Sequence, residues 1–262
     1  MGGAKSMISF KNIVKSFGTR HVLKGISFEV TEGEILFVLG TSGTGKSVLL
    51  KNIVGLLRPD QGEIWIDGQE VSRIPEDDYL PVRKMCGMVF QHPALFDSMT
   101  IFDNVAFGVR RHERHLKVEE IRERVTHCLQ LVNLTGVEDK MPNEISYGMQ
   151  KRVSLARTVA VGPKILLFDE PTTGLDPVTT SAVNQLIKDL SRKLKTTSMV
   201  VSHDMRCALE IADRIMVLDQ GHIIAQGTPD EMKRSDHPLV KDFLDEAVNE
   251  AVTPSIAEAV PE

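Results

Sequence analysis

A glycine-rich stretch near the start of the chain carries the residue types that bind a phosphate chain. Residues 40–47 read Gly-Thr-Ser-Gly-Thr-Gly-Lys-Ser and match the P-loop pattern GxxxxGK(S/T). Glycines let the backbone turn so that its N–H groups point at an anion. Lys46 is expected to reach the β- and γ-phosphates, and the Ser47 hydroxyl is expected to bind Mg²⁺. The pattern therefore predicts a nucleoside triphosphate site made of Gly40, Thr41, Ser42, Gly43, Thr44, Gly45, Lys46, Ser47 and Val48.

Two adjacent acids follow a second apolar stretch and supply the groups that hydrolysis requires. Residues 165–168 read Ile-Leu-Leu-Phe, and Asp169 and Glu170 come directly after them. In a P-loop protein this is the Walker B strand, whose aspartate holds Mg²⁺ directly or through water. Glu170 is then placed to polarise the attacking water, a general-base role worth about 10²–10⁴ in rate. Taken alone, the string also fits a strand that ends in a solvated acid pair.

Apolar runs and helical spacings around these motifs predict the elements that position them. A strand is expected over residues 34–39, where a continuous apolar run follows Glu34 and stops at Gly40, which is typical of a buried central strand. A helix is expected from Ser47 to Leu57, so that its positive end faces the phosphates bound by the P-loop. Further strands are expected at 8–10, 22–30, 62–67, 87–90, 165–168 and 198–201, with a hairpin over 215–225 and a capping box at 228–231.

The stretch from about 98 to 160 differs from its surroundings. Apolar residues recur there at helical spacing with charges between them, and no strand pattern interrupts them. We interpret it as a helical subdomain inserted into an alternation of strands and helices, which implies a mostly parallel sheet with helices on its faces. The sequence thus predicts one α/β domain over residues 1–245, and the Ala, Glu and Pro content of the end predicts a flexible tail over 246–262.

Bulk properties narrow the class of protein further. The 262 residues have room for one large domain or two small ones. The net charge of −5 argues against a protein that works on nucleic acid. The sequence has no run of about 18 apolar residues, the length needed to span a membrane. Its three cysteines are far apart and lack the spacing of a disulfide framework or a zinc site.

Further motifs occur in one order along the chain and resemble those of the ABC ATPase family. Residues 145–150 read Ile-Ser-Tyr-Gly-Met-Gln and are similar to the signature motif LSGGQ, with Ser146 and Gly148 in place of its serine and second glycine. A serine and a glycine at a helix N-terminus form an anion-binding end. The resemblance implies that this end meets the γ-phosphate held by a second copy of the chain. Tyr147 and Met149 depart from the family pattern.

Four other residues extend the resemblance. Gln91 follows a strand as the Q-loop glutamine does, and its amide would contact Mg²⁺ or water. Asp176 resembles the D-loop aspartate and also fits a helix cap before Pro177. His203 resembles the H-loop histidine, which contacts the γ-phosphate. Phe17 is placed where the family sets an aromatic ring against adenine, although a phenylalanine near a strand end also fits the core.

The family resemblance covers nearly all of the chain and implies a fold and cofactors. The fold would be a P-loop NTPase of the ABC ATPase type, with a RecA-like mostly parallel sheet, an antiparallel β subdomain and the inserted helical subdomain. ATP and Mg²⁺ would be bound, with Ser47, Gln91 and Asp169 at the metal. Glu170, His203 and Gln91 would be the catalytic residues.

The apolar region after Gln91 indicates a partner. Residues 94–107 read Ala-Leu-Phe-Asp-Ser-Met-Thr-Ile-Phe-Asp-Asn-Val-Ala-Phe, a string that fits either contact surface or packing within the helical insertion. Together with residues 169–180, 201–205 and 238–244, it resembles the ATPase subunit of bacterial Mla-type (MCE-associated) phospholipid transporters. The resemblance implies an integral membrane permease that docks on this region. It also implies an MCE-domain lipid-binding subunit, a small STAS-like regulatory subunit and a position at the cytoplasmic face of the inner membrane.

Other interpretations of the sequence stay open. The chain fits an ATPase for a small solute such as an amino acid, because the chemistry would be the same with a different permease. A soluble non-transport ABC ATPase is disfavoured because the chain has neither two nucleotide domains nor a long coiled coil. A nucleotide sensor without activity is disfavoured by Glu170 and His203. The basic block 110–114 fits a solvated helix end or a docking surface for a partner or acidic lipid headgroups.

Overall fold

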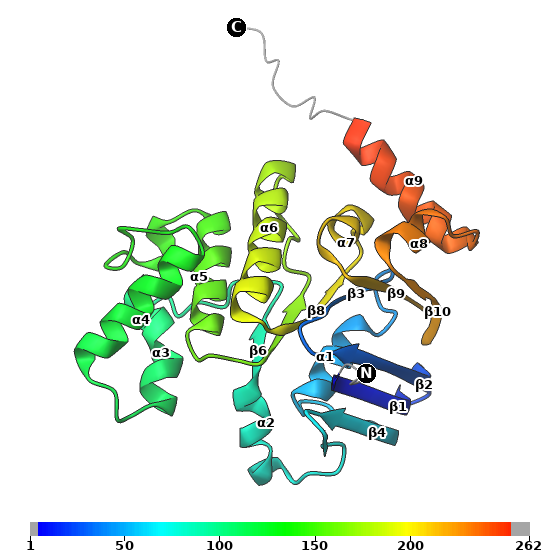
Figure 1. Cartoon of the computed structure of the whole chain (residues 1–262), viewed down its shortest axis with the longest axis horizontal. Helices are drawn as coiled ribbons and strands as arrows, with labels where there is room; N and C mark the ends of the chain where they lie inside the picture. The colour runs from blue at the N-terminus through cyan, green and yellow to red at the C-terminus, as the bar shows by residue number, and fades with distance from the viewer. Residues whose placement is uncertain (1–4, 253–262) are drawn as a thin grey trace, which may run out of the picture.

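The computed structural model describes residues 5–252, with side chains described for residues 5–248. The larger of its two sheets has six strands in the order β10-β9-β3-β8-β7-β6 (Figure 1). Neighbouring strands run parallel, except that β10 is antiparallel to β9. These strands are β3 (Ile35–Leu39), β6 (Cys86–Val89), β7 (Ile165–Asp169), β8 (Thr197–Ser202), β9 (Arg214–Asp219) and β10 (His222–Gly227).

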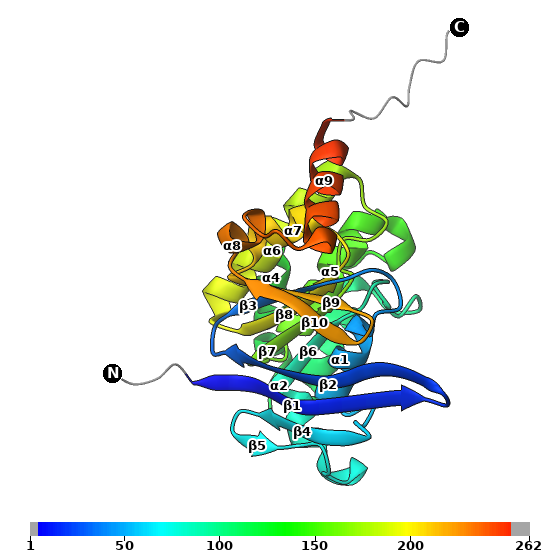
Figure 2. The ribbon, with the colours of Figure 1, turned by 90° about the vertical axis from the view of Figure 1, so that its right-hand side faces the viewer.

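The second sheet is antiparallel and lies against the first one, as Figure 2 shows. Its order is β2-β1-β4-β5. The Asp67-Gly68 turn joins the last two of its strands, with φ of 48° and 81° at these two residues, as a tight hairpin requires. The strands are β1 (Ser6–Phe17), β2 (Arg20–Thr31), β4 (Gln61–Ile66) and β5 (Gln69–Glu70).

Strand β3 shows why the larger sheet is buried on both faces. Its side chains alternate between the faces because successive residues of a strand point in opposite directions. Ile35, Phe37 and Leu39 enter one core, whereas Leu36 and Val38 enter the other. The strand pairs with β8 on one side and β9 on the other, which confirms the central position predicted from its apolar run.

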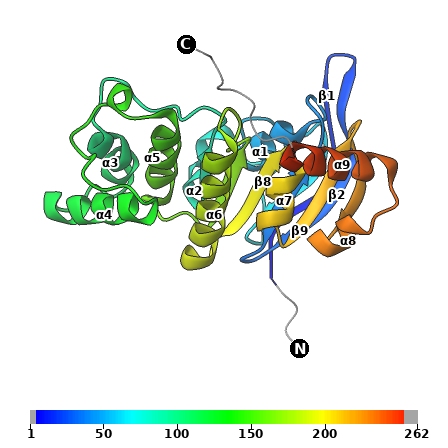
Figure 3. The same cartoon turned by 90° about the horizontal axis from the view of Figure 1, so that it is seen from above.

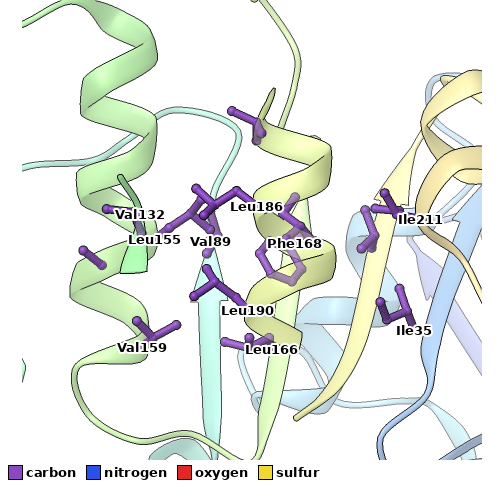
Figure 4. Close-up of a cluster of buried hydrophobic side chains, with 14 of the residues drawn as sticks. Ile35, Val89, Val132, Leu155, Val159, Leu166, Phe168, Leu186, Leu190 and Ile211 are labelled. Atoms are coloured by element: carbon purple, nitrogen blue, oxygen red, sulfur yellow. The ribbon is translucent and has the colours of Figure 1, made fainter. Parts of the chain in front are cut away.

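The two cores are built from different elements. One fills the space between the sheets and includes the apolar side of helix α1 (Lys46–Ile53). The other lies on the opposite face of the larger sheet. Figure 4 shows Leu166 and Phe168 of β7 beside Leu186 and Leu190 of α6 (Pro177–Leu194), with Leu155 of α5 (Tyr147–Val159) across from them.

Phe168 is one of the largest fully buried side chains of this core. Its side chain is fully buried directly before Asp169, so that Phe168→Ala would leave a cavity. We expect the substitution to lower the free energy of unfolding by about 3–5 kcal/mol. Leu56→Ala, at an exposed leucine, is the control and should cost less than about 1 kcal/mol. Urea unfolding followed by circular dichroism measures both, and equal losses would contradict the assignment of this core.

The region between the strands β6 and β7 is helical. It holds α3 (Ile101–His112), α4 (Val118–Leu131), the 3₁₀ turn η2 (Pro142–Glu144) and α5. Figure 1 and Figure 3 place these helices beside α6, at the end of the molecule away from the antiparallel sheet. The inserted helical part of the predicted fold is therefore confirmed. Before it, the 3₁₀ turn η1 (Glu76–Asp78) and α2 (Leu80–Met85) connect β5 to β6.

Helix α1 is shorter than predicted, since it ends at Ile53 and not at Leu57. Gly55 adopts a φ of 69°, and the N–H groups of Leu56 and Leu57 turn back to the carbonyl of Lys51. A glycine in the left-handed region is a common way to end a helix. The apolar spacing that continues past it does not reveal this end.

The end of the domain also corrects the prediction. After α7 (Met205–Ile211), the short helix α8 (Pro229–Lys233) begins with the predicted capping box at Thr228. Helix α9 (Pro238–Val252) then runs through residue 246, where a flexible tail was expected to begin. Val240, Phe243 and Ala247 have helical spacing and are buried in the core with α7, which explains the longer helix. The rest of the expected tail lies outside the described residues.

Candidate nucleotide-binding and hydrolysis site

The predicted P-loop opens on a cavity of about 760 Å³ beyond the ends of β3, β7 and β8. This is the edge of a parallel sheet where ligands of α/β proteins bind. Residues from the P-loop, the antiparallel sheet, the larger sheet and α9 surround it. The lining residues are Phe17, Arg20, Val22, Thr41, Ser42, Gly43, Gly45, Lys46, Ser47, Val48, Gln91, Glu170, Thr173, His203, Phe243 and Glu246.

The P-loop backbone needs glycine where it turns into α1. Gly45 precedes the first residue of the helix and has a φ of 108°. A Cβ atom at this position would lie 2.9 Å from Cδ2 of Leu23 and 3.0 Å from Cγ1 of Val22, both of which belong to β2. Gly45 therefore lets the loop pass against the antiparallel sheet, and the first residues of α1 line the cavity.

Lys46 is the buried cation of the site. Its side chain is 6% exposed, and its Nζ atom donates to the carbonyls of Gly40 at 2.7 Å and Thr41 at 3.0 Å. The same atom lies 3.6 Å from Oε1 of Glu170. Burial lowers the pKa of Lys46, and the nearby charges of Glu170 and Asp169 oppose that shift. A buried ammonium group whose partners are loop carbonyls fits an anionic phosphate group.

Ser47 lines the cavity and brings its hydroxyl oxygen next to a carboxylate oxygen of Asp169. Oγ of Ser47 donates to Oδ1 of Asp169 at 2.7 Å, although the residues belong to α1 and β7. Among the described residues, no group of three or more His, Cys, Asp or Glu side chains could hold a metal ion by itself. This donor set fits Mg²⁺, which takes one or two protein oxygens and completes its shell with phosphate and water.

Glu170 carries a strained backbone and several hydrogen bonds. Its φ of 49° lies in the left-handed region, which residues with side chains rarely adopt, and such strain concentrates at functional sites. Its Oε2 atom accepts from the hydroxyls of Thr173 and Ser202, each at 3.2 Å, and lies 2.9 Å from Nδ1 of His203. The carboxylate is thereby held at the cavity between His203 and Lys46.

Six predicted site residues do not line this cavity. Gly40, Thr44 and Asp169 are neighbours in the chain of residues that do, whereas the other three, Ser146, Gly148 and Asp176, belong to the starts of other helices. Ser146 caps α5 by accepting from the N–H of Met149 at 3.3 Å, and Gly148 follows in the first turn. Asp176 caps α6 by accepting from the N–H of Thr179 at 2.9 Å, as predicted. None of the three lines the cavity formed by the described part of the same chain. Their predicted contacts require a second copy.

Phe17 lies at the rim of the cavity and is 47% exposed, so the core interpretation of this residue is wrong. Other lining residues were not predicted. Arg20 donates to the carbonyl of Gly43 at 3.0 Å, and its position three residues after Phe17 was the available signal. Phe243 and Glu246 arrive from α9, more than 190 residues after the P-loop, and no local pattern points to them.

Comparisons with known proteins agree with this geometry. Residues 23–173 match the ABC transporter family. The chain is 41% identical over 237 residues to the probable ribonucleotide transport ATP-binding protein mkl of Mycobacterium leprae, which covers 90% of this chain and 68% of that one. It is also 41% identical over 240 residues to the intermembrane phospholipid transport system ATP-binding protein MlaF of Haemophilus influenzae, covering 92% of this chain and 90% of that one.

Solved structures extend the likeness to three dimensions. A dimeric ATP-binding cassette in a post-hydrolysis state, bound to ADP and Pi, superposes with a TM-score of 0.78 and 32% identity. The match covers 85% of this chain and 99% of the other. The chain therefore belongs to the ABC transporter family, as an ATP-binding subunit with the P-loop NTPase fold that hydrolyses ATP.

Membership of this family implies two general properties. ATPases of this family form dimers and associate with membrane permeases. In the part of the chain that the structure describes, no helix has the length and apolar character to cross a bilayer. The transported substrate differs between the two relatives, so membership alone does not give the cargo.

Proposed function

We propose that this chain energises phospholipid transport between bacterial membranes, as the ATPase subunit of an ABC permease at the cytoplasmic face of the inner membrane. The observation that carries the proposal is the match to MlaF, which covers 92% of this chain and 90% of that protein at 41% identity. The mycobacterial relative is equally similar but is covered over only 68% of its length. An MCE-domain subunit and a small STAS-like subunit are proposed partners on the same ground.

The proposed binding step uses the residues around the P-loop. The loop from Gly40 to Gly45 and the start of α1 bind the phosphates, and Lys46 gives up its loop carbonyls to reach the β- and γ-oxygens. Ser47, Asp169 and the amide of Gln91 would hold Mg²⁺, which neutralises charge on these oxygens. The exposed ring of Phe17 would stack on the adenine.

The proposed hydrolytic step uses the carboxylate of Glu170. Glu170 accepts the proton of the attacking water, and His203 orients that carboxylate through the contact of 2.9 Å between Nδ1 and Oε2. Hydrogen bonds from Thr173 and Ser202 to Oε2 leave Oε1 as the freer oxygen on the side of Lys46. The strained backbone keeps this carboxylate aimed into the cavity.

The second half of each site would come from a second copy. Ser146 and the first turn of α5 present backbone N–H groups at a helix end, which suits a γ-phosphate held by the partner subunit. In this arrangement Asp176 contacts the partner across the dimer while it caps α6. Two ATP molecules are then enclosed between two chains.

Ser146→Ala tests this arrangement. The serine lies outside its own chain's cavity, so that ATP affinity of the monomer should stay within about twofold of wild type. ATP-induced dimerisation should weaken about tenfold, because one charge-assisted hydrogen bond to the partner's phosphate is lost. Fluorescent-nucleotide binding measures the first property and sedimentation the second. An equal loss of monomer affinity would sink the cross-dimer assignment.

A permease surface is proposed beside the strand β6, in the region after Gln91. Phe96 and Phe107 are 41% and 38% exposed, with ring centroids 4.8 Å apart. Ile101 and Val105 from the same string are buried, so that only part of it belongs to the core. Two exposed rings side by side form an apolar patch suited to a short helix of a membrane subunit.

The cargo is tested with the complete transporter. The chain is purified with its membrane partner, placed in liposomes that contain labelled phospholipid, and supplied with ATP and acceptor liposomes. We expect labelled lipid to be transferred, and a complex that carries Glu170→Gln to transfer none above background. Mass spectrometry of the purified complex identifies bound small molecules. A bound amino acid or nucleotide, without lipid transfer, would replace the proposed cargo.

A further inference from the structure

A buried lysine on α5 holds the segment that carries Gln91. We call residues 91–94 the strap, because they lead from β6 toward the helical insertion. The side chain of Lys151 is only 2% exposed, and its Nζ atom donates to the carbonyl oxygen of Gln91. Among the described residues, that carbonyl is the one hydrogen-bond acceptor of the ammonium group. A buried cation with one fixed acceptor constrains that acceptor strongly.

Two other side chains of α5 bind the rest of the strap. Tyr147 places its hydroxyl 3.4 Å from Nδ1 of His92. Arg157 donates to the carbonyls of Pro93 at 3.2 Å and Ala94 at 2.8 Å. Every residue of the strap is therefore tied to α5 by at least one contact. Tyr147, which departs from the family's signature motif, is one of the ties.

Lys151 occupies the central place among these contacts. Its Nζ atom lies 5.5 Å from the centre of the Tyr147 ring, so that the ammonium group also attracts the ring face. Lys151 follows Ser146 by five residues, about 7.5 Å along the helix axis. About one and a half turns of rigid helix, together with the Lys151 side chain, thus connect the N-terminal end of α5 to the carbonyl of Gln91.

We propose that Lys151 is a positioning residue that locks the strap to α5 and thereby couples the two ATP sites of the dimer. This inference rests on the proposed function of Ser146 at the partner's ATP. Gln91 lines the cavity of its own chain, whereas Ser146 caps the helix end offered to the other one. Lys151 joins the segment of Gln91 to the helix of Ser146. Closure of the dimer on one ATP therefore moves the residues that contact the second ATP. Binding and hydrolysis at the two sites become positively cooperative.

The test compares Lys151→Met with Lys151→Arg in the full chain. Methionine keeps an unbranched side chain, one atom shorter, and removes the charge, whereas arginine keeps the cation. In the nucleotide-free protein, hydrogen exchange of peptides spanning residues 91–96 should rise about tenfold in Lys151→Met and return toward wild type in Lys151→Arg. For two coupled sites, the Hill coefficient of ATP hydrolysis by the wild type should lie between about 1 and 2. In Lys151→Met it should fall to about 1. ATP affinity of the monomer should stay within about twofold of wild type.

Arg152→Met is the matched control. Arg152 is the next residue of α5 and also donates to a backbone carbonyl, that of Asn133, at 3.5 Å, which is outside the strap. The control should keep both the exchange of the strap and the Hill coefficient. Unchanged hydrogen exchange of the strap in Lys151→Met would show that Lys151 does not hold the strap on α5. Faster exchange with an unchanged Hill coefficient would show that Lys151 does not couple the two ATP sites. A wild-type protein with a Hill coefficient of 1 would instead contradict the proposed paired function, while the exchange data still decide the lock.

Discussion

Glu170→Gln should bind ATP as wild type does and hydrolyse it about 10²–10⁴ times more slowly. Glutamine has the size of glutamate and can still contact Thr173, Ser202 and His203, the groups that hold Oε2. An amide cannot accept the proton of the attacking water, so that the chemical step fails while the cavity keeps its shape. ATP affinity should stay the same or rise, because one negative charge near the phosphates is removed.

Phosphate release under steady-state conditions measures the turnover of Glu170→Gln, and equilibrium dialysis measures its affinity. Glu63→Gln, at an exposed carboxylate of β4, is the matched control and should keep wild-type turnover. Turnover of Glu170→Gln near that of the control would remove Glu170 from the general-base role. A loss of ATP binding would show instead that this carboxylate maintains the cavity.

Lys46→Met should lower the affinity for ATP about 100-fold, equivalent to about 3 kcal/mol. The change removes the cation that donates to the P-loop carbonyls of Gly40 and Thr41 but keeps an unbranched side chain, one atom shorter. It also leaves the carboxylate of Glu170, 3.6 Å away in the wild type, without its neutralising partner beside the bound phosphates. Both effects weaken the binding of a polyanion.

Titration calorimetry with ATP checks the effect of Lys46→Met. Lys51→Met lies on the same helix at an exposed position and should bind ATP within about twofold of wild type. Circular dichroism of both variants verifies that the fold is kept. Wild-type affinity in Lys46→Met would place the triphosphate elsewhere than on this loop.

Much of the fold could be predicted because its signals are local. The apolar run of β3, the glycines of the P-loop and the acids after β7 each indicate an element or a turn without reference to the rest of the chain. The caps at Ser146 and Asp176 belong to the same class, since an N-cap bonds to a backbone N–H three residues later. The same kind of local pattern identified the P-loop residues that line the cavity near Lys46.

Contacts between distant segments could not be predicted in the same way. Phe243 and Glu246 reach the cavity because α9 packs on α7, and their sequence pattern indicates only an amphipathic helix. From the sequence, Lys151 would be expected to be exposed on its helix. It is buried because the strap folds over it. A cation on a helix is usually solvated, so that only the fold reveals this one as a structural tie.

Sedimentation velocity of Glu170→Gln, with and without ATP and Mg²⁺, tests most directly whether the chain works as a paired ATPase. We expect a monomer of 29.1 kDa without nucleotide. With ATP, which this variant binds without rapid hydrolysis, we expect a species of twice that mass with one ATP bound per chain. A sample that remains at the monomer mass at saturating ATP, with the nucleotide bound, would contradict the paired ATPase.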